Sequence, residues 1–416
     1  MQSKVKDVWK GLRDTMDELI LEQARELLLE RVHRVEEKEE ILLYNAVGRV
    51  LAEDVVAEHD QPPFPRSPLD GYAVRSEDIR GASRGCPAKL TVIDEVDAGY
   101  VSGKCVEKGN AVRIMTGAPI PEGADCIVGQ EDSDYGEDTV EIYEEVRAYE
   151  NYCFAGEDYK TGARLLEKET LLGAVEVGVL ASLGRETVTV YRRVKAAVLT
   201  TGDETVLPGE RLSGGKIYDS NLYMAAARLS VWGVRITSRG HERDDAGAIA
   251  ERIKAIAKEA DIVITTGGVS VGKKDEMHEV LRLLGCKRIF WKIAVKPGMP
   301  ILCAEYQGKL LICLSGNPYG AAVNLELLVR PVVAKLSGRE DLKLQRIQAV
   351  SESIFSRKSM VTRYVRAHYR SGKVRIPEGS NASGILGSMC GCNCLIEIPA
   401  GMPELLKGDA VWVVLL

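Results

Sequence analysis

The stretch Asp261-Ile-Val-Ile-Thr-Thr-Gly-Gly-Val-Ser-Val-Gly-Lys-Lys-Asp275 predicts how the central part of the chain folds. Residues 262–266 are apolar or β-branched, as in a buried parallel strand. A glycine-rich turn follows at 267–272, and residues 275–285 show a helical pattern that ends at Gly285. Such a strand, turn and helix start can form an anion site, because backbone N–H groups and the helix dipole point at one place. The alternative is that the glycines only make a tight turn.

The same alternation of strand and helix extends to both sides of this stretch, over residues 194–338. It predicts a doubly wound α/β domain whose polar loops follow the strands at 201–204, 267–275, 292–296 and 315–318. Lys292 and Lys296 would share one face if they lay in a strand. Glycines with two lysines suit a phosphorylated ligand, and the acids in the same crevice suit Mg²⁺.

Most of the remaining chain shows short β-like runs, so the predicted fold class is α/β plus β, with several domains. We predict a helical and linker segment at 1–61 that 161–193 completes, and a small β module inserted at 62–160. The α/β domain at 194–338 is followed by a β-barrel-like domain at 339–416. Within the first segment, residues 14–35 predict an amphipathic helix, and 46–56 a short helix that runs into a strand.

Four prolines between residues 61 and 74 argue against regular structure there. They predict an extended arm that carries Asp70 away from its own module, at a turn before Gly71. The alternative is that this segment is only an interdomain linker, although a linker seldom carries large apolar and aromatic residues such as Phe64, Leu69 and Tyr72.

Composition narrows the class of protein. A net charge of −6 argues against nucleic-acid binding. The sequence contains no apolar run of about 18 residues, so it predicts no membrane span. The first residues lack the apolar core of a signal peptide, which predicts a cytoplasmic protein whose ten cysteines are reduced. Cys390, Cys392 and Cys394 alternate as in a strand, and a metal site there would need a fourth ligand that the sequence does not show.

Residues 268–272 also match the G-x-S-x-G pattern of serine hydrolases, with Ser270 as the nucleophile. A triad would need a later histidine, and only His278 and His368 follow Ser270. His278 belongs to the next predicted helix and His368 to another domain. Neither position suits a catalytic triad with Ser270, which argues against a hydrolase.

Seven motifs in a fixed order carry a resemblance to a known family. They are Pro63-Phe-Pro-Arg-Ser-Pro-Leu-Asp-Gly-Tyr-Ala73, Met115-Thr-Gly-Ala-Pro119, Thr201-Gly-Asp-Glu204, Tyr218-Asp-Ser-Asn221, Gly267-Gly-Val-Ser-Val-Gly272, Lys296-Pro-Gly298 and Ser315-Gly-Asn-Pro318. From about residue 19 onward, the chain resembles molybdopterin molybdenumtransferase, the MoeA and gephyrin E-domain family. The resemblance implies insertion of molybdate into adenylylated molybdopterin, with Mg²⁺ and release of AMP. It also implies a homodimer with shared sites, and molybdopterin adenylyltransferase as the upstream partner.

The resemblance also implies residue roles, with Asp70, Thr116 and Asp158 facing the site from the partner subunit. The implied catalytic residues are Asp70, Glu204, Asp244, Asp275, Lys292 and Lys296, of which Glu204, Asp244 and Asp275 would also hold the metal. The implied substrate-binding residues are Thr116, Asp158, Asp219, Ser220, Asn221, Gly267, Gly268, Ser270, Ser315, Gly316, Asn317, Pro318, Arg363, Arg366 and Ser380. Either Arg363 or Arg366 is expected to reach the ligand.

Two departures from the family pattern are visible. Pro68-Leu69 stands where Ala-Met is usual, which should stiffen the arm, and Met299 replaces a usual lysine, which removes one positive charge. A pterin-binding or scaffolding protein without transferase activity is the alternative function. The presence of Asp70, Glu204, Asp275, Lys292 and Lys296 favours the enzyme.

Overall fold

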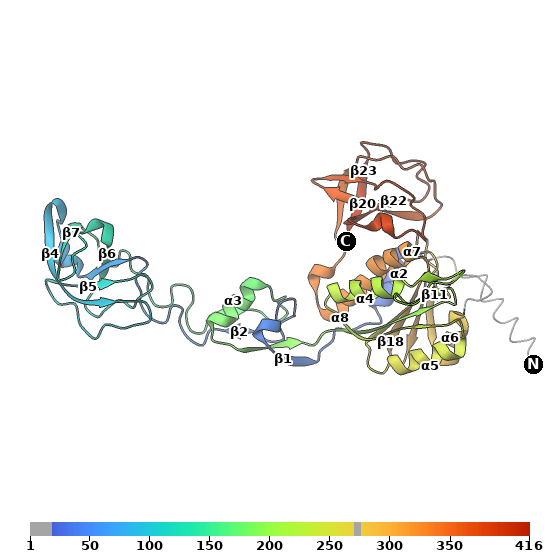
Figure 1. Ribbon diagram of the computed structural model, residues 1–416, viewed down its shortest axis with the longest axis horizontal. Helices are drawn as coiled ribbons and strands as arrows, with labels where there is room; N and C mark the ends of the chain where they lie inside the picture. Colours follow the sequence, from blue (N-terminus) through green and yellow to red (C-terminus); the bar gives the residue numbers. More distant parts are fainter. Residues whose placement is uncertain (1–18, 270–275) are drawn as a thin grey trace, which may run out of the picture. The chain divides into compact units, whose positions relative to one another are not determined.

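The structure, a computed structural model, describes residues 19–269 and 276–416. The chain divides into two compact units, which are described separately. The larger unit comprises residues up to 39, 48–50 and 190–416, and the smaller unit comprises 40–47 and 51–189. Figure 1 shows the elements of both.

A six-stranded sheet forms the centre of the larger unit, in the order β13-β10-β14-β18-β17-β15. The first four strands are parallel and the last two are antiparallel to their neighbours. The bounds are Arg235–Glu242 for β13, Lys195–Thr201 for β10, Ile262–Thr266 for β14, Lys309–Leu314 for β18, Leu302–Tyr306 for β17 and Lys287–Trp291 for β15. The predicted strand at 262–266 is therefore confirmed, and all five of its residues are buried.

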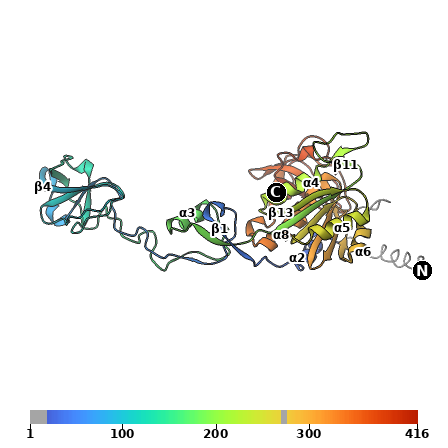
Figure 2. The ribbon, with the colours of Figure 1, turned by 60° about the horizontal axis from the view of Figure 1, so that its bottom comes forward.

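Helices cover both faces of this sheet, as the doubly wound prediction requires (Figures 1 and 2). One face carries α5 (Ala246–Ile256) and α6 (Met277–Leu284), which ends at Gly285 in the left-handed conformation as predicted. The other carries α2, α4 and the helix run from residue 318 to 337. The bounds on that face are Leu21–Leu29 for α2, Asn221–Val231 for α4, Pro318–Asn324 for α7, Leu325–Val329 for the π-helical segment η4 and Arg330–Ser337 for α8.

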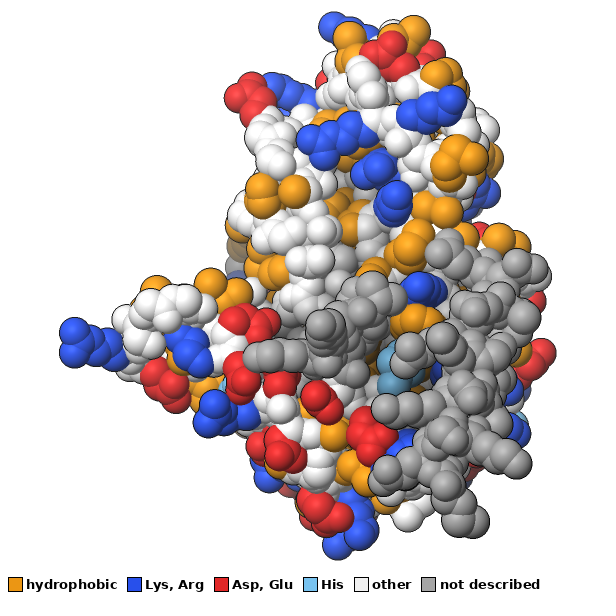
Figure 3. Space-filling model, turned by 90° about the vertical axis from the view of Figure 1, so that its right-hand side faces the viewer, with side chains coloured by type: hydrophobic (Ala, Val, Ile, Leu, Met, Phe, Trp, Pro, Cys, Tyr) orange, Lys and Arg blue, Asp and Glu red, His pale blue; other side chains and the backbone are white. Residues whose placement is uncertain are grey.

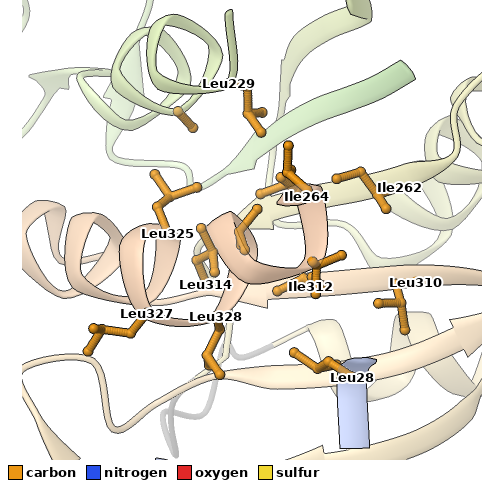
Figure 4. Packing of buried hydrophobic residues seen from close by; sticks show 14 of the residues in the cluster. Leu28, Leu229, Ile262, Ile264, Leu310, Ile312, Leu314, Leu325, Leu327 and Leu328 are labelled. Atoms are coloured by element: carbon orange, nitrogen blue, oxygen red, sulfur yellow. The ribbon is translucent and has the colours of Figure 1, made fainter. Parts of the chain in front are cut away.

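Alternate side chains of each strand enter different cores. Ile262 and Ile264 pack with α4 and α7, whereas Val263 packs with α5 and α6. Figure 4 shows Ile262, Ile264, Ile312 and Leu314 of the sheet against Leu229 and Leu325 of the helices. Each such buried side chain contributes about 1.5–3 kcal/mol, so the two apolar faces hold the helices on the sheet.

The C-terminal part of the larger unit is a closed five-stranded barrel, which confirms the barrel-like prediction. The strands pair in the order β20-β21-β19-β23-β22, and β22 pairs again with β20. Strand β16 of the α/β domain extends the barrel by pairing in parallel with β20. The bounds are Val295–Lys296 for β16, Arg346–Ser351 for β19, Thr362–Arg370 for β20, Lys373–Arg375 for β21, Cys394–Ile398 for β22 and Ala410–Leu415 for β23.

The smaller unit contains a five-stranded sheet in the order β6-β3-β5-β4-β7. Its bounds are Cys126–Gly129 for β6, Gly71–Val74 for β3, Asn110–Ile114 for β5, Ser83–Val96 for β4 and Thr139–Glu144 for β7. Elsewhere in the chain lie Lys38–Leu42 (β1), Val55–Val56 (β2), Arg164–Leu166 (β8), Ala174–Ser182 (α3), Thr187–Tyr191 (β9), Thr205–Val206 (β11), Ile217–Tyr218 (β12) and the 3₁₀ turns Leu43–Asn45 (η1), Ser76–Ile79 (η2), Gln130–Asp132 (η3), Glu340–Leu342 (η5) and Gly387–Met389 (η6).

Two helix predictions in the N-terminal segment were wrong. The helix expected over 14–35 is α2, which ends at Leu29, while residues 14–18 lie outside the described part. After Glu30 the chain turns, and Val35 donates its N–H to the carbonyl of Leu336, so a distant contact replaces the helix. The helix expected near 46 is only the turn η1, because Leu51 and Ala52 donate their N–H groups to Thr170 and Thr189.

The proline-rich arm also differs from its prediction. Gly71–Val74 forms β3, a fully buried strand between β6 and β5. A Cβ on Gly71 would lie 1.9 Å from the carbonyl oxygen of Val128, so only glycine allows this close pairing. Arg66 bridges Pro119 and Cys153 on either side, so the arm packs onto its own module and is not carried away from it.

Candidate functional site

Three loops meet through backbone contacts at the carboxyl ends of β10, β14 and β18. A Cβ on Gly267 would lie 2.3 Å from the carbonyl oxygen of Thr201, and one on Gly316 would lie 3.5 Å from the Cα of Gly267. Gly267 and Gly268 also have φ angles of 102° and 61°, in the left-handed region that favours glycine. The side chain of Asn221, at the start of α4, donates to the carbonyl of Gly316 over 2.8 Å. The polar loops predicted at this edge of the sheet therefore meet one another, as expected for an open α/β fold.

A fourth loop, residues 296–298, lies next to the loop 315–318. A Cβ on Gly320 would lie 3.3 Å from the Cβ of Ser315 and 3.4 Å from the nitrogen of Gly298. The loops 296–298 and 315–318 are therefore neighbours at the start of α7, where Pro318 is the first helical residue. Ser315 is buried, and its hydroxyl accepts the N–H of Asn317.

The two lysines do not lie in one strand, so the condition under which they would share one face is not met. Lys292 follows the end of β15 with a φ of 69°, in a conformation that is strained for a residue with a side chain, and Lys296 lies on β16. The ammonium of Lys292 lies 4.2 Å from the centroid of the Trp291 ring. The Trp291 indole N–H donates to the carbonyl of Val269, which attaches this lysine to the glycine turn.

Arg363 on β20 is the register partner of Lys296 on β16, so two cationic residues from different domains lie side by side. The Nε of Arg363 is buried without a hydrogen-bond partner, and burial lowers the pKa of its guanidinium, to which the nearby charge of Arg357 adds. Within 19–269 and 276–416, no carboxylate forms an ion pair with Lys296 or Arg363. This pair therefore presents uncompensated positive charge, which suits an anion.

Arg366 has a different place from Arg363. Its side chain is fully buried, and it donates to the carbonyls of Ser380, Ala382 and Ile385. Its guanidinium also stacks 3.9 Å from the centroid of the Tyr319 ring. Tyr319 in turn donates its N–H to the carbonyl of Ser383, so Arg366 holds the loop around Ser380 against the start of α7.

Glu204 and Asp244 come from adjacent loops. The N–H of Asp203 donates to Oδ2 of Asp244 over 3.2 Å, and a Cβ on Gly202 would lie 2.6 Å from Oε2 of Glu204. Among the described residues no group of three or more His, Cys, Asp or Glu side chains is arranged to hold a metal ion. Two carboxylates fit Mg²⁺ only together with oxygens from a ligand or water, which is the usual way in which Mg²⁺ binds. Asp275 and Ser270 lie outside the described residues.

Asp219 and Ser220 lie at the start of α4, as predicted. Asp219 is buried, and its carboxylate accepts the N–H of Leu222 and the hydroxyl of Thr200. His241 joins them, because its Nδ1 lies 3.4 Å from the Thr200 hydroxyl and 3.2 Å from that of Thr205. Sequence reasoning missed Thr200 and His241, since only the pairing of β10 with β13 places them opposite one another.

The smaller unit holds a second polar group around Asp70. The N–H and the hydroxyl of Thr116 both donate to Oδ1 of Asp70, over 2.7 and 2.6 Å. These two hydrogen bonds lower the pKa of Asp70 below its ordinary value, the hydroxyl contributing most. Asp158 lies on an exposed loop whose N–H donates to the carbonyl of Gln61, at the opposite end of the proline-rich segment. The structure thus brings Asp70 and Thr116 into contact, while the expectation that these two residues and Asp158 face a site stays a prediction.

Thr116→Val should raise the pKa of Asp70 toward its ordinary value of 3.8, because the hydroxyl that stabilises the carboxylate is removed while the shape is kept. A depressed pKa stabilises the folded state above the unfolded pKa, and this contribution is lost as the pH falls through the folded pKa. The variant should therefore lose less stability in acid. Carboxyl-carbon NMR titration of Asp70 measures the pKa, and an unchanged value would remove Thr116 as its cause.

The remaining polar groups do not support the alternatives to an anion site. All ten cysteines are free, and of the alternating three only Cys394 lies within β22. The ring of His278 packs edge-on against Trp291, and His368 lies 4.0 Å from the sulfur of Cys392 in the barrel. Neither contact resembles a hydrolase triad. No helix in the described part of the chain has the length and apolar character to cross a membrane.

The fold and the loops at the edge of the sheet define a multidomain protein that is built on an open α/β domain and carries positive charge beside glycine turns. Comparison with known proteins matches residues 19–184 to the MoeA N-terminal region (domain I and II), 197–335 to a probable molybdopterin binding domain and 348–416 to the MoeA C-terminal region (domain IV). The chain belongs to the MoeA family, which acts in molybdenum cofactor biosynthesis, and it is an enzyme of the transferase class.

Similar proteins cover nearly all of the chain. Molybdopterin molybdenumtransferase of Staphylococcus epidermidis (strain RP62A) is 37% identical over 378 residues, which is 90% of each chain. The protein of that name from Staphylococcus aureus (strain COL) is 36% identical over the same share. The crystal structure of the molybdopterin biosynthesis MoeA protein from Pyrococcus horikoshii OT3 has a TM-score of 0.79 at 30% identity, and covers 96% of this chain and all of its own.

Proposed function

We propose that this protein is a molybdopterin molybdenumtransferase, which inserts molybdate into adenylylated molybdopterin and releases AMP. The observation that carries the proposal is the meeting of the glycine loops at 201–202, 267–268 and 315–316 near Lys296 and Arg363, with which no carboxylate of residues 19–269 and 276–416 forms an ion pair. Backbone groups and two positive charges at one crevice suit a substrate that carries phosphates and an oxyanion. The names of its relatives support the same reaction.

We assign the positive charge at the site to Lys296 and Arg363, with Lys292 beside the glycine turn. Arg363 is chosen over Arg366 because the guanidinium of Arg366 is fully buried and bonded to carbonyls of its own domain. Lys296 and Arg363 would stabilise the negative charge of the oxyanion and of the leaving phosphate. Asn221, Gly267, Gly316 and Asn317 would bind the pterin or its phosphate through the loops described above.

Mg²⁺ is proposed as the cofactor, held by Glu204 and Asp244 together with phosphate oxygens of the substrate. Carboxylate oxygens are the protein ligands that Mg²⁺ prefers, and one or two of them suffice when phosphates complete the shell. When bound, Mg²⁺ would neutralise charge on the phosphates. Asp275, which lies outside the described residues, remains a predicted third ligand.

A homodimer is also proposed, in which Asp70 and Thr116 of one subunit face the crevice of the other. An aspartate is ionised at neutral pH, and the hydrogen bonds from Thr116 lower the pKa of Asp70 further, so it would enter such a site as an anion. The adenylylated substrate must come from an enzyme that transfers an adenylyl group to molybdopterin. Molybdopterin adenylyltransferase is therefore the proposed upstream partner.

The direct test is AMP release from adenylylated molybdopterin in the presence of molybdate and Mg²⁺. Release that depends on molybdate, with transfer of molybdenum to the pterin measured by mass spectrometry, supports the proposal. Tight pterin binding without AMP release would instead identify a binding or scaffolding protein.

Glu204→Gln and Asp244→Asn should each raise the Mg²⁺ concentration needed for half-maximal turnover by about 10- to 100-fold. The physical reason is the loss of one charge-assisted contact, worth roughly 1.5–3 kcal/mol. A titration of turnover against Mg²⁺ measures the change. Glu251→Gln, which alters an exposed ion pair on α5, is the control and should leave the titration unchanged. Wild-type magnesium dependence in both site variants would exclude these carboxylates as ligands.

A further inference from the structure

Asn324 lies in the core as the last residue of α7, where the helix widens into the π-helical segment η4. Its side chain is 1% exposed. The amide Nδ2 donates to the carbonyl of Gly298 over 3.0 Å, and Oδ1 is buried without a hydrogen-bond partner. A buried amide with an unsatisfied oxygen costs stability, so a compensating role is expected.

Gly298 and Asn324 fit each other closely. A Cβ on Gly298 would lie 2.4 Å from Oδ1 of Asn324 and 3.2 Å from the carbonyl oxygen of Gly320, and Gly298 has a φ of 101°. Glycine at 298 therefore leaves room for the amide, and the amide holds the carbonyl of Gly298. Two residues earlier on the same loop stands Lys296, which no side chain of the described residues holds in place by a hydrogen bond or an ion pair.

We propose that Asn324 is a positioning residue for the transfer reaction, which sets the place of Lys296 by holding the loop 296–298 through the Gly298 carbonyl. This inference rests on the proposed function of Lys296. The π-helical segment supports it, because such segments commonly occur at functional sites and the wider turn follows directly after Asn324. Asn324 contacts the loop and not the substrate, so it acts through Lys296.

The first test needs no substrate. Asn324→Asp keeps the shape of the side chain but removes the donor to Gly298, and Asn324→Ala removes the whole contact. Hydrogen–deuterium exchange of the peptide covering 292–301 should rise about tenfold or more in both variants, since a backbone carbonyl loses its anchor. Asn393→Ala is the matched control, because this amide also bonds to the backbone, at Tyr369 in the barrel. Unchanged exchange in 292–301 would overturn the inference.

The second test measures the consequence for catalysis. Both variants should lower kcat by about 10- to 100-fold, the effect expected when a reacting group is displaced by roughly 1 Å. In a Lys296→Ala background, Asn324→Ala should cause no further loss, because the two residues act as one unit. Additive losses would contradict action through Lys296. Activity of Asn324→Asp should recover in mild acid, where a buried carboxyl group becomes protonated and can donate to Gly298.

Gly298→Ala offers a test from the opposite side, should the Asn324 variants fold poorly. It should raise exchange over 292–301 and lower kcat, and the combination with Asn324→Ala should cost less than the two changes added together, since the clash with Oδ1 is relieved. Strict additivity would contradict the inference. A wild-type protein without transferase turnover would contradict the proposed function alone, because the exchange experiments still decide whether Asn324 holds the loop.

Discussion

Asp70→Asn should lower molybdenum insertion by about 10²- to 10⁴-fold, the loss typical for a catalytic carboxylate. The change keeps the shape of the side chain and removes its charge, which Thr116 stabilises by lowering the pKa of Asp70. Folding should be little affected, because the group lies at the surface of its module. AMP release and molybdenum transfer under single-turnover conditions measure the loss.

Asp94→Asn is the matched control for this prediction. Asp94 lies in the same module, and its carboxylate accepts a hydroxyl from Ser102 over 2.6 Å, much as Asp70 accepts that of Thr116. Asp94→Asn therefore removes a hydrogen-bonded carboxylate from the same module at a different position from Asp70. Equal turnover losses in the two variants would show that the effect of Asp70→Asn is structural. Full activity of Asp70→Asn would remove this residue from the reaction.

Lys296→Ala should lower turnover by about 10²- to 10³-fold, the cost of removing one group that stabilises developing negative charge. The structural reason is that Lys296 and Arg363 are register partners on neighbouring strands. Neither cation has a carboxylate partner within the described residues, and Nε of Arg363 is buried without a hydrogen bond. Arg363→Ala should cause a loss of the same kind. Lys343→Ala, at an exposed ion pair with Glu340, should leave turnover unchanged.

Mixing the two inactive variants tests the proposed dimer. If Asp70 and Lys296 reach one site from different subunits, a mixed dimer of Asp70→Asn and Lys296→Ala has one site with both changes and one intact site. Activity should then return to about half of the wild-type value per mixed dimer, because one of its two sites is complete. No recovery after demonstrated subunit exchange would mean that both residues serve a site within one chain.

The local sequence pattern was sufficient to predict a helix or strand wherever the spacing of apolar residues within the segment marks its buried face. The strand at 262–266 was predicted with its bounds, and the helix was predicted with its end at Gly285, because an apolar run and a glycine C-cap are local signals. The doubly wound α/β domain and the C-terminal barrel followed from the same reasoning and are confirmed. The domain boundaries and the roles of the site residues remain predictions.

Distant contacts overruled the local pattern elsewhere. The N-terminal helix ends at Leu29 because Val35 bonds to Leu336, and the arm before Asp70 lies on its module because Arg66 pairs with residues 119 and 153. Lys292 and Lys296 are separated because the backbone turns at Lys292 through a positive φ, which no local signal requires.

Residue order alone thus determined the fold class, the positions of the polar loops and the motifs that carry the family resemblance. Only the tertiary structure distinguished Arg363 from Arg366, since both are arginines on one strand and their difference lies in what surrounds them. The same holds for Asn324, whose partner is 26 residues away. Local pattern reports the preferences of neighbouring residues, whereas burial and hydrogen-bond partners depend on segments that meet only when the chain has folded.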